Sequence, residues 1–392
     1  MLCHKLIRMP QSKPHNLPAL YLLTLPGLEK LAAEEVEHVL GGEIKRVAKG
    51  LVVFRLPHLD RSIFRLRLAE DVFLLLWGSD QLSYRAKDLE LIERWTAREP
   101  DWETAWFWHH QLRPKPRGKP TYHLVCQMFG EHGYRRVDAL EALIKGLRGR
   151  IPASWRAVEE DAAVEIWLTI RGKTAVCGLR LSDRTMRHRD YKVEHLPASL
   201  RPVAAAALIW LAQPQSQELV LDPMCGAGTI LAERLAFDRT GVILGGDRDW
   251  TALRAAAANL QFFASHISDR EHRDEGNQIW PLVRWDARQL PLRDLSIPVI
   301  ACNPPFGKQI GAGEDVGLLY RELVPEWDRV LQPRGRVAVV VADWQAFARP
   351  AQNCRWQCRR KFSVLLLGQE VWLSLWVKPA PSHEQAQHAK RS

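Results

Sequence analysis

Residues 218–229 read Glu-Leu-Val-Leu-Asp-Pro-Met-Cys-Gly-Ala-Gly-Thr, and this stretch decides the fold. Its apolar residues at 219–221 predict a short buried strand that ends at Asp222, and the two glycines that follow predict a tight turn. An apolar, alanine-rich helix is expected next, at 229–237. A strand, a glycine turn and a helix in this order are typical of a ligand site at the carboxyl edge of an open α/β sheet.

Three more predicted strands follow, and each ends at a polar residue. The first closes on Asp247, the second on Asp286, and the third, an apolar run at residues 297–300, leads to Asn303-Pro-Pro-Phe306. A single glycine turn is weak evidence for a site. Four strand ends in sequence, each with a polar residue at the ligand-binding edge, are much stronger evidence.

The acids at this edge predict a cofactor that contains a nucleoside. A carboxylate at the end of the second strand can accept both hydroxyls of a ribose, and the third acid can accept from an adenine amino group. We therefore expect the cofactor to contact Asp222, Pro223, Met224, Cys225, Gly226, Ala227, Gly228, Thr229, Asp247, Arg248, Asp286, Ala287 and Asn303.

The four residues Asn303, Pro304, Pro305 and Phe306 predict chemistry on an amino group. An asparagine side-chain carbonyl and the Pro304 backbone carbonyl, in a loop that the two prolines stiffen, can together hold one planar NH2 group. The Phe306 ring offers a surface on which a base can stack. We take these four residues as the candidate catalytic set.

The rest of the carboxyl-terminal half predicts a completed sheet. Residues 336–342 form a fifth apolar strand, and residues 363–367 and 370–377 form two more. Since a two-residue connection cannot make a parallel crossover, the last strand should pair antiparallel with the strand before it.

At residues 196–379 these motifs resemble the class I S-adenosylmethionine-dependent methyltransferases, whose seven-stranded sheet ends in an antiparallel hairpin. More narrowly, the motifs at 222–229 and 303–306 resemble those of RNA guanine-N2 methyltransferases that carry a THUMP domain. The amino-terminal half agrees, because residues 21–31 resemble the start of that family's ferredoxin-like domain and residues 178–191 the end of its THUMP domain.

This resemblance implies an α/β chain with a Rossmann-like methyltransferase domain preceded by ferredoxin-like and THUMP α+β domains. We expect a flexible tail at 1–17, a ferredoxin-like domain at 18–65, a THUMP RNA-binding domain at 66–183, a basic linker at 184–195, the methyltransferase domain at 196–379 and a tail at 380–392. The amino-terminal half should contain a helix over residues 28–40, a strand over 44–56 and an exposed loop between Glu99 and Pro120.

The charge distribution agrees with an RNA partner. Residues 1–195 carry 32 Lys and Arg against 25 Asp and Glu, and residues 196–392 carry 23 against 20, which together give the net charge of +10. A basic auxiliary domain attracts a polyanion, although solubility alone can favour the same surplus. The candidate RNA contacts are two basic clusters: Arg184, Arg187, Arg189 and Lys192, and Arg113, Lys115, Arg117 and Lys119.

The seven cysteines show no spacing typical of a zinc site or a disulfide framework, and we expect no metal and a reducing compartment. We expect a cytoplasmic protein, although the basic, acid-free residues 1–20 slightly resemble a targeting segment. Cys302 adjoins the reactive loop, as a thiolate nucleophile would. Its place on the strand side of Asn303 argues against covalent catalysis.

The resemblance implies methyl transfer from S-adenosylmethionine to the N2 amine of guanosine in RNA. A tRNA is the expected substrate, with a position in the acceptor stem such as guanosine 6, and a small activating subunit can be part of such an enzyme. Two other hypotheses stay open: methylation of the adenine N6 amine in RNA or DNA, and a non-catalytic RNA-binding protein with a relict methyltransferase fold.

Overall fold

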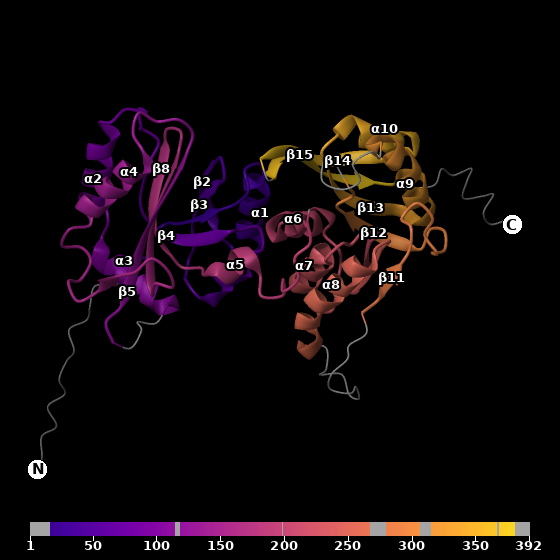
Figure 1. Ribbon diagram of the computed structural model, residues 1–392, viewed down its shortest axis with the longest axis horizontal. Helices are drawn as coiled ribbons and strands as arrows, with labels where there is room; N and C mark the ends of the chain where they lie inside the picture. Colours follow the sequence, from indigo (N-terminus) through magenta and orange to yellow (C-terminus); the bar gives the residue numbers. More distant parts are fainter. Residues whose placement is uncertain are drawn as a thin grey trace, which may run out of the picture.

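The computed structural model describes residues 16–113, 118–197, 199–266, 280–305, 315–366 and 368–380. Two β-sheets lie side by side along the long axis of the molecule, an eight-stranded sheet in the amino-terminal half and a seven-stranded sheet in the carboxyl-terminal half (Figure 1). None of the helices in the described ranges is long and apolar enough to cross a membrane.

The amino-terminal sheet has the strand order β2-β3-β1-β4-β8-β7-β5-β6. Its strands are β1 (Leu20–Leu23), β2 (Glu43–Ala48), β3 (Leu51–Arg55), β4 (Asp71–Ser79), β5 (Thr121–Phe129), β6 (Arg156–Ala157), β7 (Val164–Arg171) and β8 (Thr174–Arg180). The helices of this half are α1 (Glu29–Leu40), α2 (Asp88–Arg98), α3 (Trp102–Leu112), α4 (Arg136–Gly146) and the 3-10 turn η1 (Arg61–Arg65).

Two expectations for this half are wrong. The single strand expected over residues 44–56 is a hairpin of β2 and β3, because the chain turns at Gly50, which has a φ of +69°. The segment between Glu99 and Pro120 contains helix α3 where an exposed loop was expected. Asp101 caps this helix by accepting from the Thr104 amide, and Trp102 is buried.

The carboxyl-terminal sheet has the order β11-β10-β9-β12-β13-β15-β14. Its strands are β9 (Leu219–Asp222), β10 (Val242–Asp247), β11 (Leu282–Arg284), β12 (Ile297–Cys302), β13 (Leu331–Val341), β14 (Gln357–Leu366) and β15 (Gln369–Val377). The helices are α6 (Pro202–Ala212), α7 (Thr229–Phe237), α8 (Trp250–Leu260), α9 (Val316–Val330) and α10 (Trp344–Asn353), and the 3-10 turn η2 (Gln261–His266) follows α8.

The strands of this second sheet run parallel from β11 to β13, and β15 then runs antiparallel to both of its neighbours. The hairpin predicted from the short connection is therefore confirmed. Because β9, β10, β11 and β12 are parallel, their carboxyl ends meet at one edge, where open sheets of this kind bind ligands.

The two halves contact each other directly. Helix α5 (Arg184–His188) and the residues after it connect them, while α1 and the tip of the β14–β15 hairpin meet between the sheets (Figure 1). The Leu365 amide donates to the Pro26 carbonyl at 3.0 Å, and Arg360 of β14 pairs with Glu34 of α1. One apolar cluster includes buried residues of both halves, so their interface is part of the core.

Candidate active site

The glycine turn between β9 and α7 lies at the carboxyl edge, and its two glycines have different reasons to be glycine. Gly226 has a φ of +50° and no heavy atom within 4 Å of where a Cβ would lie, so it leaves space for a ligand. Gly228 has a φ of +72°, and a Cβ there would come within 3.0 Å of Ala256 on α8. Gly226 thus keeps the cavity open, and Gly228 allows two helices to pack closely.

Asp247, at the end of β10, ties this turn to its own strand. Its carboxylate accepts from the Gly226 amide and from the Asp249 amide, both at 3.0 Å. A carboxylate has about four acceptor positions, so these two bonds leave others for a ligand hydroxyl. Asp247 is therefore held in one orientation and can still bind.

Asp222, at the end of β9, is a buried acid with an altered pKa. It is 1 % exposed, and burial raises the pKa of its carboxyl group to about 7, with Asp247 adding to the rise. The Met224 amide at 3.3 Å and the Cys302 thiol donate to Asp222 and oppose that rise. Near neutral pH this carboxyl group is poised between its two protonation states.

Asp286 differs from the other two acids because an arginine already holds it. Both of its carboxylate oxygens accept from Arg288, with Nη2 at 2.6 Å, and the same guanidinium reaches Glu322 of α9 at 3.1 Å. The hydrogen bonds from Arg288 lower the pKa of Asp286. An adenine amino group would share this carboxylate with Arg288.

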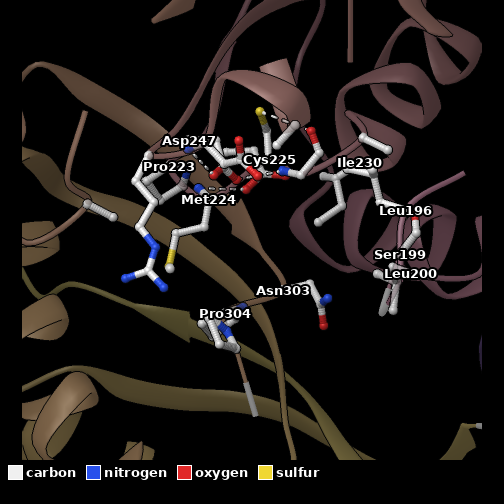
Figure 2. Close-up of a pocket in the computed structure, with 18 of the residues that line it drawn as sticks. Leu196, Ser199, Leu200, Pro223, Met224, Cys225, Ile230, Asp247, Asn303 and Pro304 are labelled. Atoms are coloured by element: carbon white, nitrogen blue, oxygen red, sulfur yellow. Dashed lines mark hydrogen bonds between the residues drawn. The ribbon is translucent and has the colours of Figure 1, made fainter. Parts of the chain in front are cut away.

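Asn303 follows β12, and its side-chain oxygen is the unusual atom of the site. Oδ1 is buried, yet among the described residues it has no hydrogen-bond partner. Leaving a buried acceptor unpaired costs about 1–3 kcal/mol, so such an atom points to a ligand that donates to it. Asn303 and Pro304 lie across the cavity from Met224 and Asp247 (Figure 2).

The loop after Asn303 is held from behind by α9. Tyr320 donates its hydroxyl to the Pro305 carbonyl at 3.3 Å, and its ring is fully buried. Asn303, Pro304 and Pro305 all line the cavity. Phe306, the fourth predicted member of the set, lies outside the described residues.

These elements enclose a cavity of about 430 Å³, a size that suits a nucleoside-containing cofactor. Of the predicted cofactor residues, all except Gly228 line it. Several wall residues were not predicted from the sequence: Leu196, Pro197, Ser199, Ile230, Asp249, Ala252, Trp285, Arg288, Leu319, Leu323, Leu366 and Gln369.

Comparison with known proteins agrees with this architecture. Residues 189–370 match the family described as "RMKL-like, methyltransferase domain". This part of the chain is similar to that family's methyltransferase domain. The crystal structure of TrmN from Thermus thermophilus has a TM-score of 0.71 and 26% identity, covering 92% of this chain and 99% of that one. The predicted α/β fold is confirmed.

Curated relatives extend the similarity beyond the methyltransferase domain. The tRNA (guanine(6)-N2)-methyltransferase of Thermus thermophilus is 29% identical over 323 residues, which are 81% of this chain and 87% of that protein. The tRNA (guanine(6)-N(2))-methyltransferase THUMP3 of Bos taurus is 29% identical over 197 residues, 50% of this chain and 38% of that protein. The chain spans about two fifths of the length of the mammalian THUMP3 relatives that it matches. The predicted resemblance to THUMP-type guanine-N2 methyltransferases is confirmed at the level of this class.

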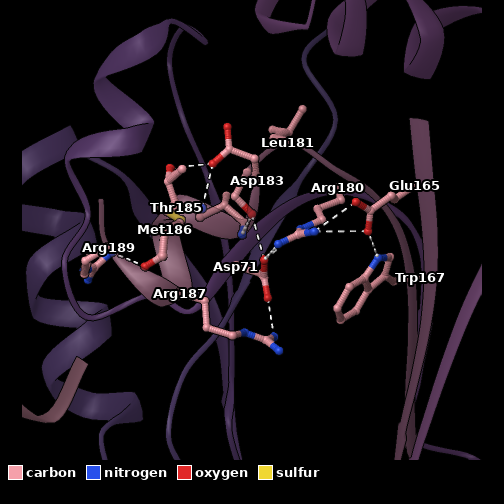
Figure 3. A network of polar contacts seen from close by, with 12 residues as sticks. Asp71, Glu165, Trp167, Arg180, Leu181, Asp183, Thr185, Met186, Arg187 and Arg189 are labelled. Atoms are coloured by element: carbon pink, nitrogen blue, oxygen red, sulfur yellow. Dashed lines mark hydrogen bonds and ion pairs between the residues drawn. The ribbon is translucent and has the colours of Figure 1, made fainter. Parts of the chain in front are cut away.

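The first basic cluster lies between the amino-terminal half and the methyltransferase domain, where most of its cations have intramolecular partners. Asp71, fully buried on β4, pairs with Arg180 of β8 and Arg187 of α5 (Figure 3). Arg187 also lies 5.8 Å from the centre of the Trp167 ring. Lys192 donates to the Leu200 carbonyl at 3.0 Å, and burial lowers its pKa to about 8.

Arg189 requires a correction, because its side chain is not accessible to RNA. It is 6 % exposed and donates to Glu233 at 3.2 Å and to the Arg67 carbonyl at 2.6 Å. This pairing places it in the core of the joint between the two halves. Arg184 is the member of this cluster that stays exposed.

The second basic cluster is only partly described. Arg113 donates through Nε to the Leu181 carbonyl at 2.8 Å and lies 3.4 Å from Asp183, so it is already used within the protein. Lys119 is exposed and remains a candidate for RNA contact. Lys115 and Arg117 lie outside the described residues.

Glu233 on α7 is the central acceptor of the contact between the amino-terminal half and the methyltransferase domain. It is 1 % exposed and accepts from Arg67 at 2.9 and 3.0 Å and from the Tyr191 hydroxyl at 2.7 Å, besides Arg189. Burial alone would raise the pKa of Glu233, but the charges of Arg67 and Arg189 bring it below the usual value. The helix that begins at the glycine turn is thereby fixed to the amino-terminal half.

Proposed function

We propose that this chain is an S-adenosylmethionine-dependent tRNA (guanine-N2)-methyltransferase. The observation that carries the proposal is the buried Oδ1 of Asn303, which has no hydrogen-bond partner among the described residues; Asn303 lies across a cavity of about 430 Å³ from the glycine turn and Asp247. The similarity to curated guanine-N2 methyltransferases supports the same activity. A buried acceptor beside such a cavity calls for a donor, and an exocyclic amine supplies two.

The cavity has the groups that a nucleoside-containing methyl donor needs. Asp247 would accept from the ribose hydroxyls, Asp286 and Ala287 would border the adenine, and Gly226 and Asp222 would border the methionine part. S-adenosylmethionine, when bound, supplies a methyl group on a positively charged sulfur. The partly ionised Asp222 carboxyl group, at about pH 7, suits a cationic ligand.

The residues of the chain act mainly by positioning the amine. The guanine 2-amino group is conjugated with its ring, so its lone pair is poorly available. Hydrogen bonds from its two protons to Asn303 Oδ1 and the Pro304 carbonyl would draw the nitrogen toward tetrahedral geometry and aim its lone pair at the methyl group. Alignment of the two groups supplies much of the rate. No strong base is required before transfer, because the surplus amine proton can pass to solvent once the nitrogen carries the methyl group.

The substrate in this proposal is tRNA, methylated in the acceptor stem, with guanosine 6 as the first candidate. The ferredoxin-like part at 18–65 and the THUMP part at 66–183 would bind the RNA, and the linker at 184–195 would connect them to the methyltransferase domain. The protein would act in the cytoplasm, where a small activating subunit can bind the methyltransferase domain. If the target base is paired, its extrusion costs a few kcal/mol, which stacking and phosphate contacts must offset.

A second candidate reaction is methylation of the adenine N6 amine, because Asn303 and Pro304 can hold the amine of either base. The basic amino-terminal half and the named relatives favour guanosine. Nucleoside analysis of the product distinguishes the two reactions, since N2-methylguanosine and N6-methyladenosine separate by chromatography and mass. The relict hypothesis predicts no S-adenosylmethionine binding in calorimetry.

The decisive experiment compares tRNA and ribosomal RNA from cells that lack this protein with RNA from the parent strain. We expect one N2-methylguanosine to disappear from the acceptor stem of a subset of tRNAs, and the purified protein to restore it from labelled S-adenosylmethionine. Loss of a methyladenosine would support the second candidate reaction. Unchanged tRNA and ribosomal RNA would contradict the proposed tRNA methylation and adenine methylation of these RNAs.

A further inference from the structure

The outer face of the β14–β15 hairpin carries an exposed lysine held between two indole rings. The ammonium of Lys361 on β14 lies 3.8 Å from the ring centre of Trp344 and 3.8 Å from that of Trp372. Both tryptophans are partly exposed, and their ring centres lie 6.3 Å apart. Two aromatic faces hold this ammonium in one position, whereas the ammonium of a surface lysine is usually free to move.

Lys361 has no acidic partner within the described residues, where every carboxylate oxygen lies beyond 4.0 Å of its ammonium. Two other lysines are neutralised: Lys378 pairs with Asp328 at 3.2 Å, and Lys45 pairs with Glu43. The Lys361 ammonium has three N–H donors, and aromatic faces use them poorly. Its charge is therefore positioned by the protein but not neutralised by it.

The lysine belongs to the same edge of the molecule as the reactive loop. Trp372 pairs across the sheet with Val341, the last residue of β13, and Trp344 begins the helix after that strand. Contacts between aromatic rings connect this place to the loop: Trp344 stacks on Trp376, which packs against Phe347, which packs against Tyr320. Tyr320 is the residue that donates to the Pro305 carbonyl.

We propose that Lys361, fixed by Trp344 and Trp372, binds a backbone phosphate of the substrate RNA beside the nucleotide whose base enters the Asn303 pocket. This inference rests on the proposed function, because it needs an RNA laid across the carboxyl edge of the second sheet. The indole pair keeps the ammonium in place before the RNA arrives, which lowers the entropy cost of contact. The exposed indole surfaces also offer a platform for a neighbouring base.

The test uses the full chain with Lys361→Ala, Lys361→Arg and the control Arg239→Ala. Arg239 is exposed and precedes β10, so it lies at the opposite, amino edge of the sheet. The substitution Arg239→Ala removes one positive charge, as Lys361→Ala does. RNA affinity is measured at several salt concentrations with an unmodified tRNA transcript. For Lys361→Ala we expect the slope of log affinity against log salt to fall by about 0.7–0.9, the value for one lost phosphate contact.

Lys361→Ala should also raise the KM for tRNA while kcat and S-adenosylmethionine binding stay near the wild-type values. Lys361→Arg should keep most of the RNA affinity, because it keeps the charge. An unchanged salt slope in Lys361→Ala, or an equal loss in Arg239→Ala, would overturn the proposal. A lower melting temperature with unchanged RNA binding would also overturn it, because the lysine would then only cover the two indoles.

The two proposals fail in distinguishable ways. If the wild-type protein binds tRNA but methylates no guanosine amine, the proposed function fails, and the salt slope of Lys361→Ala still decides the phosphate contact. If methylation is found and the slope does not change, the phosphate contact alone is wrong.

Discussion

Two neighbouring turns of one short helix, α7, show two opposite ways of treating polar groups in the interior. Its first turn borders the cofactor cavity, where Asn303 Oδ1 is buried without a partner among the described residues and the pKa of Asp222 is raised to about 7. One turn further along, Glu233 is equally buried but accepts from Arg67, Arg189 and Tyr191. The first region is incomplete without a ligand, and the second is complete within the chain.

This difference separates binding residues from structural ones. A buried charge is tolerated only when it is paired and hydrogen-bonded, so the Glu233 and Asp71 networks mark places where the two halves must stay fixed. An unpaired buried acceptor is costly to the folded protein, and binding of a ligand can offset that cost. Arg187 and Arg189 are structural residues of these paired networks, although their sequence pattern resembles an RNA-binding cluster.

The largest expected effect tests the Glu233 network, whose polar groups find their partners within the chain. Glu233→Ala leaves Arg67 and Arg189 buried without their carboxylate, and breaking a buried pair in this way costs about 3–5 kcal/mol. Glu34→Ala is the matched control, because Glu34 also pairs across the two halves, with Arg360, but both side chains are partly exposed. Its loss should cost about 0–1 kcal/mol.

The measurement is the free energy of unfolding in urea for both variants and the wild-type protein. Equal destabilisation by Glu233→Ala and Glu34→Ala would contradict the distinction between the buried joint and the surface pair. Cofactor binding, measured at a temperature where both variants are folded, should change little, because Glu233 does not line the cavity.

The next effect tests the cavity, where Asn303 Oδ1 has no partner among the described residues. Asn303→Ala removes the acceptor for one amine proton, and loss of a single positioned hydrogen-bonding group of this kind costs about 10²–10³-fold in kcat or more. Stability should rise or stay level, because an unpaired buried acceptor is removed. Tritium transfer from labelled S-adenosylmethionine to tRNA measures the first quantity, and thermal unfolding the second. A variant with wild-type turnover would remove Asn303 from the mechanism.

A pH effect is expected from Asp222, because burial raises the pKa of its carboxyl group to about 7. A cationic cofactor favours the ionised carboxylate, so affinity should increase as the pH rises through 7 and become about tenfold weaker at pH 6 than at pH 8. Binding near pH 7 should also release protons. Asp222→Asn should remove both effects.

Calorimetry in two buffers with different ionisation enthalpies measures this proton release. Glu35 also has a pKa of about 7 because it is buried, but it accepts from the Arg67 and Leu68 amides, away from the cavity. A pH dependence that persists in Asp222→Asn would therefore assign the titration to another group.

The polar residues of the cavity could be predicted from sequence because their signal is local. Each follows directly on a buried strand, and parallel strands bring their carboxyl ends to one edge. The same reasoning predicted the final hairpin from the shortness of its connection. Asp222, Asp247, Asp286 and Asn303 were thus placed together without knowledge of any long-range contact.

The remaining features depend on partners far apart in the sequence. Arg189 pairs with Glu233, 44 residues later, and Arg187 with Asp71, 116 residues earlier, so no local pattern reveals that they are paired. Helix α3 was taken for a loop because of its many tryptophans and the basic run after it. Arg288 could have been suspected, since it follows Asp286 by only two residues.

The smallest expected effect concerns Cys302, which ends β12 and donates its thiol to Asp222. Its thiol is fully buried, and burial followed by the charge of Asp222 raises its pKa well above the usual value, so it is a poor source of a thiolate nucleophile. Cys302→Ser keeps a donor toward Asp222. Methyl transfer should therefore fall by less than about tenfold, the rate equivalent of about 1.4 kcal/mol. If Cys302→Ser were inactive while Asn303→Ala transferred methyl groups normally, the reaction would run through a covalent thioether adduct, and the amine-positioning mechanism would have to be abandoned.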